Sequence, residues 1–280
     1  MSLKESFFSR HSIKPKGADT ESEEFKGISE GGVEKARERA QEVLDMIDQM
    51  KDGSVVFLGG ATDAIRTHST AKVYGEEAKE ILTKEGRDDI LVITDNDLKG
   101  EPGSGYKAID AAMEMVNNNK DKKILIDTPL FIKEFGMSHW TNEQGGLSDF
   151  ANELLKTNPD DSACISAWFA NKGEMEGPNG PLHGPNPTEI AEGHIKGIER
   201  LKEFADKFIK DRPVTIGVVG HSWNLDALAT YLANDGEITP EGFEKIGGKI
   251  IAETQIGKIE ISEDGQAKLL YGGKEYEVKE

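Results

Sequence analysis

The sequence has only one cysteine, Cys164, among its 280 residues. An intrachain disulfide is therefore excluded, as in most proteins of the reducing cell interior. Long apolar runs are lacking as well, and none approaches the roughly 20 residues that a membrane-spanning helix requires. The first residues lack the basic and apolar regions of a secretory signal peptide. These features together favour an intracellular, cytoplasmic protein.

Basic residues are also scarce. The chain has 34 Lys and Arg residues against 52 Asp and Glu residues, which gives a net charge of −18. Nucleic acids and anionic membranes bind to basic surfaces, so neither is expected as a partner. Any site for an anionic substrate must then be a local positive pocket in a negative field. No His, Cys or Asp cluster has metal-ligand spacing, so no metal and no other cofactor is predicted. The sequence carries no signal for an oligomeric state.

Short apolar runs alternate with helical patterns in the first hundred residues. Strands are expected at residues 7–12, which begin with an apolar pair, and at the apolar runs 54–58 and 90–93. Helical periodicity covers residues 29–50 and 63–84. Strands and helices that alternate with short links are typical of a parallel sheet with helices on its faces. We therefore predict an α/β fold of three layers, with helices on both faces of a mostly parallel central sheet.

The middle of the chain, residues 100–187, is rich in Gly, Pro and Asn. It contains four expected elements, which are helices at residues 108–117 and 147–157 and strands at 124–126 and 163–169. Residues 173–185 are nearly all turn formers. Long irregular segments are often functional lids. We interpret residues 100–187 as a substrate or lid elaboration of a single domain that spans residues 1–280.

Regular patterns return after Pro187. A long amphipathic helix comes first, followed by a strand at residues 214–219 that is apolar on both faces and by a helix at 225–232. The last part of the chain predicts three short antiparallel strands, at residues 258–261, 267–271 and 275–278.

Anion-binding residues follow three of the expected strands. Arg10 and His11 end the first strand, Arg66 follows the turn after the second, and His221 comes directly after the strand at 214–219. Any one of them alone would more simply be a surface or core residue. In open α/β sheets, however, ligands bind outside the carboxyl ends of the strands. Guanidinium groups bind phosphate oxygens, and a neutral imidazole attacks phosphorus to form phosphohistidine. The pattern therefore predicts a phosphate-ester site.

Four blocks in the order and spacing of these residues resemble the histidine phosphatase superfamily of phosphoglycerate mutase-like proteins. They read FSRH at residues 8–11, ISEGG at 28–32, TDAIRTHSTA at 62–71 and VVGH at 218–221. The resemblance covers both ends of the chain and implies a phosphoglycerate mutase-like fold. It implies His11 as the phosphorylated nucleophile, with Arg10, Arg66 and His221 binding the phosphoryl group. The expected substrate is a small phosphorylated molecule whose phosphate monoester is hydrolysed.

The proton donor is less well defined. The family often has a glutamate in an Asp-x-x-Leu-x-Glu stretch after the third strand, but here Gly100 occupies that position and Glu101 follows it. We take Glu101 as the donor, with Asp97 second and Glu174 or Glu176 as further alternatives. A donor must keep its proton near neutral pH, which requires partial burial or a like-charged neighbour.

Two other positions depart from the family pattern. Ser12 stands where a glycine usually follows Arg-His, and Ser222 stands where one branch carries an aspartate donor. Two alternative functions stay open: a catalytically impaired family member that binds a phospho-ligand or acts as a scaffold, and a mutase-type phosphotransferase. The longer mutase signatures around the first histidine are missing, so hydrolysis is favoured.

Two unrelated mechanisms are disfavoured, one by residue order and one by glycine spacing. Residues 220–224 approach a serine-hydrolase nucleophile turn, but no histidine follows Ser222. Residues 58–62 lack the Gly-x-Gly-x-x-Gly spacing of a dinucleotide loop. The remaining histidines are expected to have no catalytic role. His194 should pack on an apolar helix face, and His139 and His183 should be exposed to solvent. Three aromatic residues are expected in the core: Trp140, Trp168 and Phe169.

Overall fold

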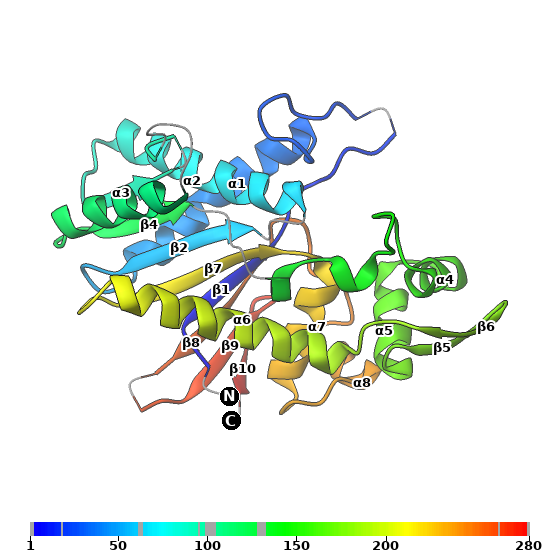
Figure 1. The fold of residues 1–280 in the computed structure, drawn as a ribbon. Coiled ribbons are helices and arrows are strands. Elements are labelled where there is room, and N and C mark those ends of the chain that lie inside the picture. Colours follow the sequence, from blue (N-terminus) through cyan, green and yellow to red (C-terminus); the bar gives the residue numbers. More distant parts are fainter. Residues whose placement is uncertain are drawn as a thin grey trace. The chain divides into compact units, whose positions relative to one another are not determined.

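Strands and helices alternate from the first strand to the fourth, as the apolar periodicity predicts (Figure 1). The computed structural model describes residues 3–17, 19–60, 64–94, 96–98, 105–127, 133–262 and 264–278. The elements of the first half are β1 (Ser6–Arg10), α1 (Glu30–Asp48), β2 (Val55–Gly60), α2 (Ile65–Glu85), β3 (Ile90–Ile93), α3 (Gly105–Asn118) and β4 (Lys123–Asp127).

The second half is richer in helices. It contains two short 3₁₀ turns, η1 (Lys133–Phe135) and η2 (Ser138–Trp140), followed by α4 (Asp149–Thr157), α5 (Asp161–Asn171), β5 (Glu174–Gly177), β6 (Gly180–His183), α6 (Pro187–Phe208), β7 (Val214–Gly220), α7 (Ser222–Ala233), α8 (Pro240–Lys245), β8 (Ile256–Ile261), β9 (Ala267–Tyr271) and β10 (Lys274–Val278). Within the described ranges, no helix is long and apolar enough to cross a membrane.

The chain divides into two compact units. Unit 1 comprises Met1–Arg10, Ile132–Glu199 and Gly220–Glu280, and unit 2 comprises His11–Phe131 and Arg200–Val219. The expected elaboration at residues 100–187 therefore contributes to both units. The boundaries fall after Arg10, Phe131, Glu199 and Val219.

Unit 2 contains a parallel sheet in the strand order β7-β2-β4-β3. Its register places Val55 opposite Val214, Gly60 opposite Val219, and Leu58 opposite Asp127. These strands are short runs of Val, Ile and Leu that are almost fully buried, as parallel strands covered on both faces are. Helix α2 packs on β2, β3 and β4, and α1 packs on α2. The predicted α/β class and its parallel sheet with helices are confirmed.

Helix α1 begins where its sequence predicts. Ser29 is the N-cap, and its hydroxyl accepts a hydrogen bond from the N–H of Gly32 at 3.1 Å. The apolar residues recur at helical spacing and are buried on one face: Val33, Ala36, Ala40, Val43, Leu44 and Ile47. Helix α2 ends at Gly86, which adopts the left-handed conformation (φ 64°) that a glycine accepts without strain.

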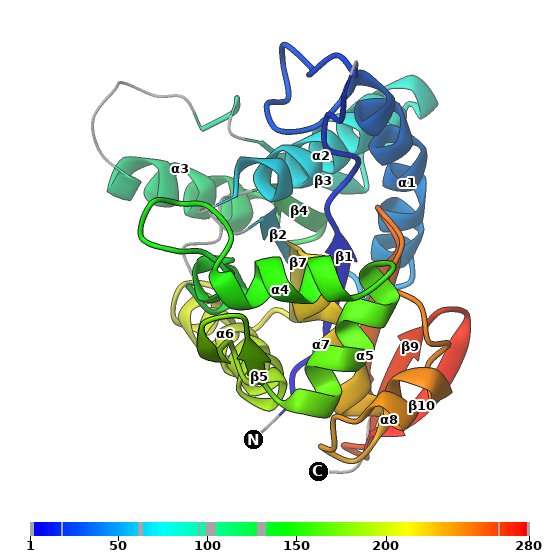
Figure 2. The same ribbon diagram turned by 90° about the vertical axis from the view of Figure 1, so that its right-hand side faces the viewer.

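Unit 1 contains the antiparallel strands β10-β9-β8-β1 in that order. The three carboxyl-terminal strands appear where the alternating sequence predicts them. Helix α7 packs against β1, β9 and β10, and α5 packs against α4 and α8 (Figure 2). The core of this unit is aromatic: the Trp140 ring lies edge-on to Trp168 and Trp223, at centroid distances of 4.7 and 4.8 Å. The predicted burial of Trp140, Trp168 and Phe169 is confirmed.

The prediction of a strand at residues 163–169 is wrong, because this segment lies inside helix α5. Asp160 caps the helix by accepting the N–H of Ala163 at 2.9 Å. The buried side chains of α5 recur at helical spacing, whereas the run as a whole is apolar and also fits a strand. Residues 173–185 contain the β5–β6 hairpin, in which Gly177 pairs with Gly180 across a tight turn.

Candidate active site

His11 follows β1 and lies at the start of unit 2, where only 7% of its surface is exposed. Its Nδ1 is 2.6 Å from the carbonyl oxygen of Ser12. A carbonyl can only accept, so Nδ1 carries the proton. Nε2 accepts a hydrogen bond of 3.2 Å from Nε of Arg66. Both contacts assign the neutral Nδ1–H tautomer, with the lone pair of Nε2 directed at the guanidinium group.

Arg66 lies in the first turn of α2, close to the end of β2. A Cβ on Gly60 would stand 2.2 Å from the backbone of Thr67, so only glycine allows the last residue of β2 to approach the helix this closely. The N-cap residue of α2, Ala64, makes no side-chain cap. A helix N-terminus without such a cap presents N–H groups and a partial positive charge, which both favour an anion.

Thr70 joins Arg66 to the segment that follows His11. Its hydroxyl donates to the carbonyl of Arg66 at 2.8 Å and accepts the N–H of Ser12 at 2.9 Å. The arginine and the residue after the nucleophile candidate are therefore held by one shared side chain. Thr70 belongs to the Thr-Ala end of the block at residues 62–71, and its own role had no signal in the sequence beyond that block.

Ser12, which replaces the usual glycine, is fully buried. Its hydroxyl donates to the carbonyl of Gly32 in the first turn of α1 at 2.6 Å. A Cβ on Gly32 would stand 2.6 Å from the carbonyl oxygen of Ile13. The segment after His11 thus lies directly against the start of α1, and the Ser12 hydroxyl uses its proton there.

Arg10 belongs to unit 1. Its Nη1 donates to the carbonyl of Ile251 at 2.8 Å, and its Nη2 lies 3.3 Å from Oε1 of Glu253. Its Nε is buried and has no acceptor within the described part of the chain.

His221 also belongs to unit 1, follows β7 and is the N-cap residue of α7. Its carbonyl accepts the N–H of Leu225 at 3.0 Å, and only 3% of its surface is exposed. In unit 2, Val219 lies opposite Gly60, and His221 follows Val219 by two residues in the chain. The structure thus brings His11 and Arg66 into direct contact, whereas Arg10 and His221 are placed in the other unit.

The proton-donor candidates differ in their surroundings. Glu101 lies outside the described residues. Asp97 accepts hydrogen bonds from Lys79 and from the N–H and hydroxyl of Thr94, at 2.6 to 2.9 Å. Burial raises the pKa of Asp97, but these hydrogen bonds outweigh it and lower the pKa below its ordinary value. Such contacts favour a structural carboxylate that holds the turn after β3.

The two alternatives on the hairpin are exposed glutamates. Glu174 lies 2.6 Å from Nδ1 of His183, and 66% and 70% of these two side chains are exposed. Glu176 is exposed on the same strand. Neither side chain has the partial burial expected of a proton donor. The predicted exposure of His183 is confirmed.

His194 is a packed core histidine, as its place on the apolar helix face predicts. It contacts the Phe135 ring at a centroid distance of 5.4 Å, and its Nδ1 lies 3.1 Å from the carbonyl of Ile190. Burial lowers the pKa of His194 to about 4, so the ring is neutral at pH 7.

Asp226 is a buried acid that sequence reasoning missed. It lies in α7, five residues after His221, and is fully buried. Its Oδ1 accepts the N–H of Ile251 at 2.9 Å and the hydroxyl of Tyr271 at 2.8 Å. Burial raises the pKa of Asp226 to about 7. A polar residue inside the apolar run at residues 225–232 was the one available signal.

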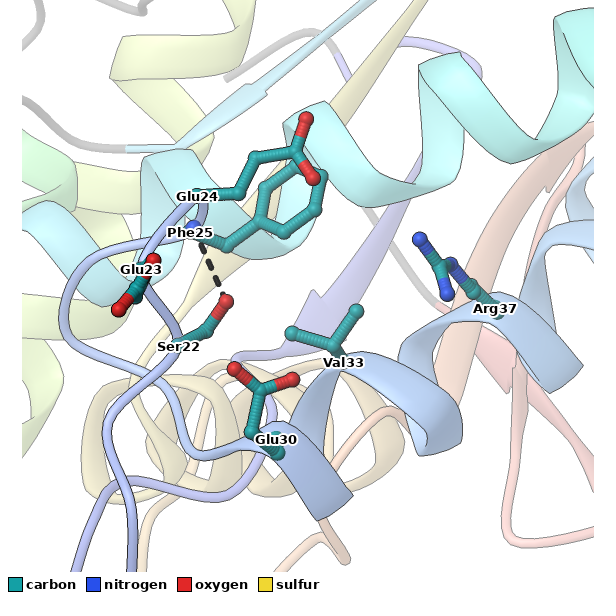
Figure 3. A pocket seen from close by; sticks show the side chains of 7 residues that line it. All are labelled: Ser22, Glu23, Glu24, Phe25, Glu30, Val33 and Arg37. Carbon is teal, nitrogen blue, oxygen red and sulfur yellow. Dashed lines mark hydrogen bonds between the residues drawn. The ribbon is translucent and has the colours of Figure 1, made fainter.

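A shallow hollow in unit 2 does not fit the expected ligand (Figure 3). None of the predicted site residues lines it, and its three glutamates outnumber its one arginine, which disfavours an anion. The lining residues are Ser22, Glu23, Glu24, Phe25, Glu30, Val33 and Arg37. Among the residues that the structure describes, no group of three or more His, Cys, Asp and Glu side chains could hold a metal ion.

Comparisons with known proteins give structural similarity only. No family model matches the sequence, and no curated protein matches it. A mycobacterial glucosyl-3-phosphoglycerate phosphatase is 14% identical, with a TM-score of 0.43 over 92% of this chain and 90% of that one. A putative α-ribazole-5′-phosphate phosphatase from Escherichia coli is 13% identical, with a TM-score of 0.42 over 97% and 96% of the two chains.

A phosphoglycerate mutase from Bacillus anthracis is 13% identical, with a TM-score of 0.38 over 99% of this chain and 93% of that one. Because these TM-scores and identities are low, we infer the function from the residues and contacts of this chain.

Proposed function

We propose that the protein is a phosphatase that hydrolyses phosphate monoesters of small molecules through a phosphohistidine on His11. The observation that carries this proposal is the state of the His11 ring. Nδ1 is engaged by the Ser12 carbonyl, and the lone pair of Nε2 is directed at the guanidinium of Arg66. A neutral imidazole with a fixed tautomer, aimed at an anion-binding group, is a nucleophile prepared for phosphorus.

The reaction has two displacements. In the first, Nε2 of His11 forms a bond to phosphorus while the bond from phosphorus to the ester oxygen breaks, and the leaving alkoxide takes a proton from an acid. In the second, water attacks phosphorus, the bond to Nε2 breaks, and inorganic phosphate leaves. The proton that the water loses returns to the same carboxylate, so the enzyme is restored.

The phosphoryl group requires positive charge in a protein of net charge −18. Arg66 supplies a guanidinium within hydrogen-bond distance of the nucleophile, and the start of α2 adds N–H groups. Preorganised donors of this kind stabilise the charge of the transition state. Arg10 and His221 are the further phosphate ligands in this proposal, on the strength of the sequence resemblance.

Glu101 is the proton donor in this proposal. The hydrogen bonds of Asp97 and the exposure of Glu174 and Glu176 disfavour the alternatives. The donor is identified by leaving-group dependence, because a poor leaving group needs the proton and p-nitrophenolate does not. We expect Glu101→Gln to slow hydrolysis of an alkyl phosphate much more than that of p-nitrophenyl phosphate. A selective loss in Asp97→Asn, Glu174→Gln or Glu176→Gln would transfer the role to that residue.

The central test is turnover of p-nitrophenyl phosphate by wild type and by His11→Ala, with His139→Gln as a matched control at an exposed histidine. We expect His11→Ala to lose at least about a thousandfold in kcat and the control to retain activity. A reaction quenched in alkali should show phosphate on His11 by mass spectrometry. Activity that survives in His11→Ala would refute the assignment.

The same assay separates the alternative functions. Binding of inorganic phosphate without turnover on a broad panel of phosphoesters would support the phospho-ligand-binding protein. Transfer of the phosphoryl group to an added alcohol in place of water would support a mutase-type phosphotransferase. Arg66→Ala should weaken phosphate binding in every case.

A further inference from the structure

A short segment just before the carboxyl-terminal strands makes several contacts with Arg10. This segment, residues 251–255, hydrogen-bonds both backbone groups of Arg10. The Arg10 N–H donates to the carbonyl of Gln255 at 3.3 Å, and the Thr254 N–H donates to the carbonyl of Arg10 at 3.0 Å. The guanidinium contacts the same segment through the Ile251 carbonyl and the Glu253 carboxylate. Backbone and side chain of one arginine are thus held by one five-residue stretch.

The 251–255 segment is strained at Thr254. This residue has a positive φ of 62° and is fully buried, although a β-branched side chain disfavours that conformation. Strain of this kind costs on the order of 1–3 kcal/mol and persists only where surrounding contacts enforce it. The hydrogen bond from Thr254 to the carbonyl of Arg10 is one such contact.

Asp226 fixes the other end of the segment. Its Oδ1 accepts the N–H of Ile251, and the hydroxyl of Tyr271 donates to the same oxygen. The carbonyl of Ile251, in turn, accepts Nη1 of Arg10 at 2.8 Å. A continuous series of hydrogen bonds therefore runs from the buried acid on α7 to the guanidinium group.

We propose that Asp226 is a positioning residue for phosphate binding: it fixes Ile251, whose carbonyl holds the guanidinium of Arg10 in one orientation. This inference rests on the proposed function, in which Arg10 is a phosphate ligand. Arginine loses considerable side-chain entropy when it is ordered, so an arginine held in place before the anion arrives binds it more tightly. Glu253 is the counter-ion of Arg10 and weakens its attraction for an anion.

The test compares Asp226→Ala with Asp226→Asn by steady-state kinetics on p-nitrophenyl phosphate, with inorganic phosphate as inhibitor. Alanine leaves the N–H of Ile251 without its acceptor, whereas asparagine keeps an oxygen there. We expect Asp226→Ala to raise KM and the inhibition constant of phosphate about tenfold at nearly constant kcat, which is about 1.4 kcal/mol of lost binding. Asp226→Asn should stay within about twofold of wild type, as should the control Glu275→Gln on β10.

A double-mutant cycle tests whether Asp226 acts through Arg10. Arg10→Ala alone should weaken phosphate binding, and adding Asp226→Ala to it should cause no further loss, because the two changes remove one interaction. Additive losses would overturn the proposal. A lower amount of active enzyme with unchanged KM would also overturn it, since that result indicates a role in folding alone.

Glu253→Gln provides a variant that keeps the fold, because this side chain is 31% exposed. It removes a negative charge beside Arg10 and should lower the inhibition constant of phosphate about two- to fivefold. If Asp226→Ala does not fold, Glu253→Gln still tests the role of the 251–255 segment. The lower inhibition constant of phosphate in Glu253→Gln should then be absent when Arg10 is also replaced by alanine. An inhibition constant that Glu253→Gln leaves unchanged would then refute the role of the 251–255 segment.

Failure of this inference is distinguishable from failure of the proposed function. A wild-type protein that neither hydrolyses phosphoesters nor binds phosphate would refute both. A wild type that depends on His11 for turnover, with a phosphate affinity indifferent to Asp226 and Glu253, would refute the positioning role alone.

Discussion

Ser12, the residue after the proposed nucleophile, is held by two hydrogen bonds that it donates. Its N–H donates to the hydroxyl of Thr70, and its own hydroxyl donates to the carbonyl of Gly32. Ser12→Gly keeps the backbone bond and loses the hydroxyl, so a buried carbonyl loses its donor. We expect a loss of about 1–3 kcal/mol in unfolding free energy, measured by urea denaturation, with kcat/KM within a few-fold of wild type. Abolished turnover in a folded Ser12→Gly protein would show that the hydroxyl takes part in catalysis.

His194 makes the folded protein less stable at acidic pH. Its pKa is about 4 in the folded protein, mainly because of burial, and about 6.5 in the unfolded chain. The unfolded state therefore binds more protons than the folded state as the pH falls. The contribution of His194 to the free energy of unfolding is present above pH 6.5 and is lost as pH falls toward 4. His194→Leu should remove about 3 kcal/mol of this loss, measured by denaturation at pH 7 and pH 4. His183→Gln, at an exposed position, should follow wild type across the range.

Asp226 has the opposite effect on the pH dependence of stability between about pH 4 and pH 7. Its folded pKa of about 7 lies above the ordinary aspartate value, so the folded state binds more protons. Its contribution is fully present below about pH 4 and is lost as pH rises through 7. The groups that face it are Arg10, Asp161 and Tyr271. Asp226→Asn should therefore gain stability relative to wild type between pH 4 and 7, and a constant difference across that range would contradict the shift.

Two adjacent glycines in the first turn of α1 allow a matched test at the scale of the element. A Cβ on Gly31 meets nothing within 4 Å, whereas a Cβ on Gly32 would stand 2.6 Å from the carbonyl of Ile13. Gly31→Ala should stabilise the helix by up to about 1 kcal/mol and leave turnover unchanged. Gly32→Ala should destabilise by about 1–3 kcal/mol and lower turnover, because it displaces the segment after His11. Equal effects of both changes on kcat would contradict this.

Periodicity predicted most elements, and its failures have physical causes. The apolar run at residues 163–169 suits a buried strand or a buried helix, and only the capping bond of Asp160 and the aromatic core around Trp168 decide for α5. The turn formers at residues 173–185 indicated a loop. A tight turn between Gly177 and Gly180 uses the same residues and joins the two strands of a hairpin.

The sequence names the residues of the candidate site, and their catalytic roles stay predictions. The motif blocks named His11 and Arg66, and the structure places them 3.2 Å apart. The orientation of the His11 ring depends on the Ser12 carbonyl, which every residue possesses and no motif encodes. The contacts of Arg10 with Ile251 connect residues 241 positions apart, and no local pattern predicts a contact of that kind.

At the scale of the whole molecule, the chain passes between its two units four times. Two of these boundaries, Arg10–His11 and Val219–Gly220, lie at the ends of β1 and β7. These two boundaries adjoin residues that the motif blocks select. The prediction of one domain over residues 1–280 rests on the strand patterns at residues 7–12 and 214–219, which run directly into these two boundaries.

The net charge of the protein affects how readily an anionic substrate approaches it. A charge of −18 repels a phosphomonoester over the Debye length, which is about 30 Å at 0.01 M salt and about 8 Å at 0.15 M. Raising NaCl across that range screens the distant carboxylates more than the short contact with Arg66. We therefore expect kcat/KM for p-nitrophenyl phosphate to rise about two- to threefold and to fall again near 1 M. A steady decrease from the lowest salt onward would mean that the local positive groups, and not the net charge, govern the approach of the substrate.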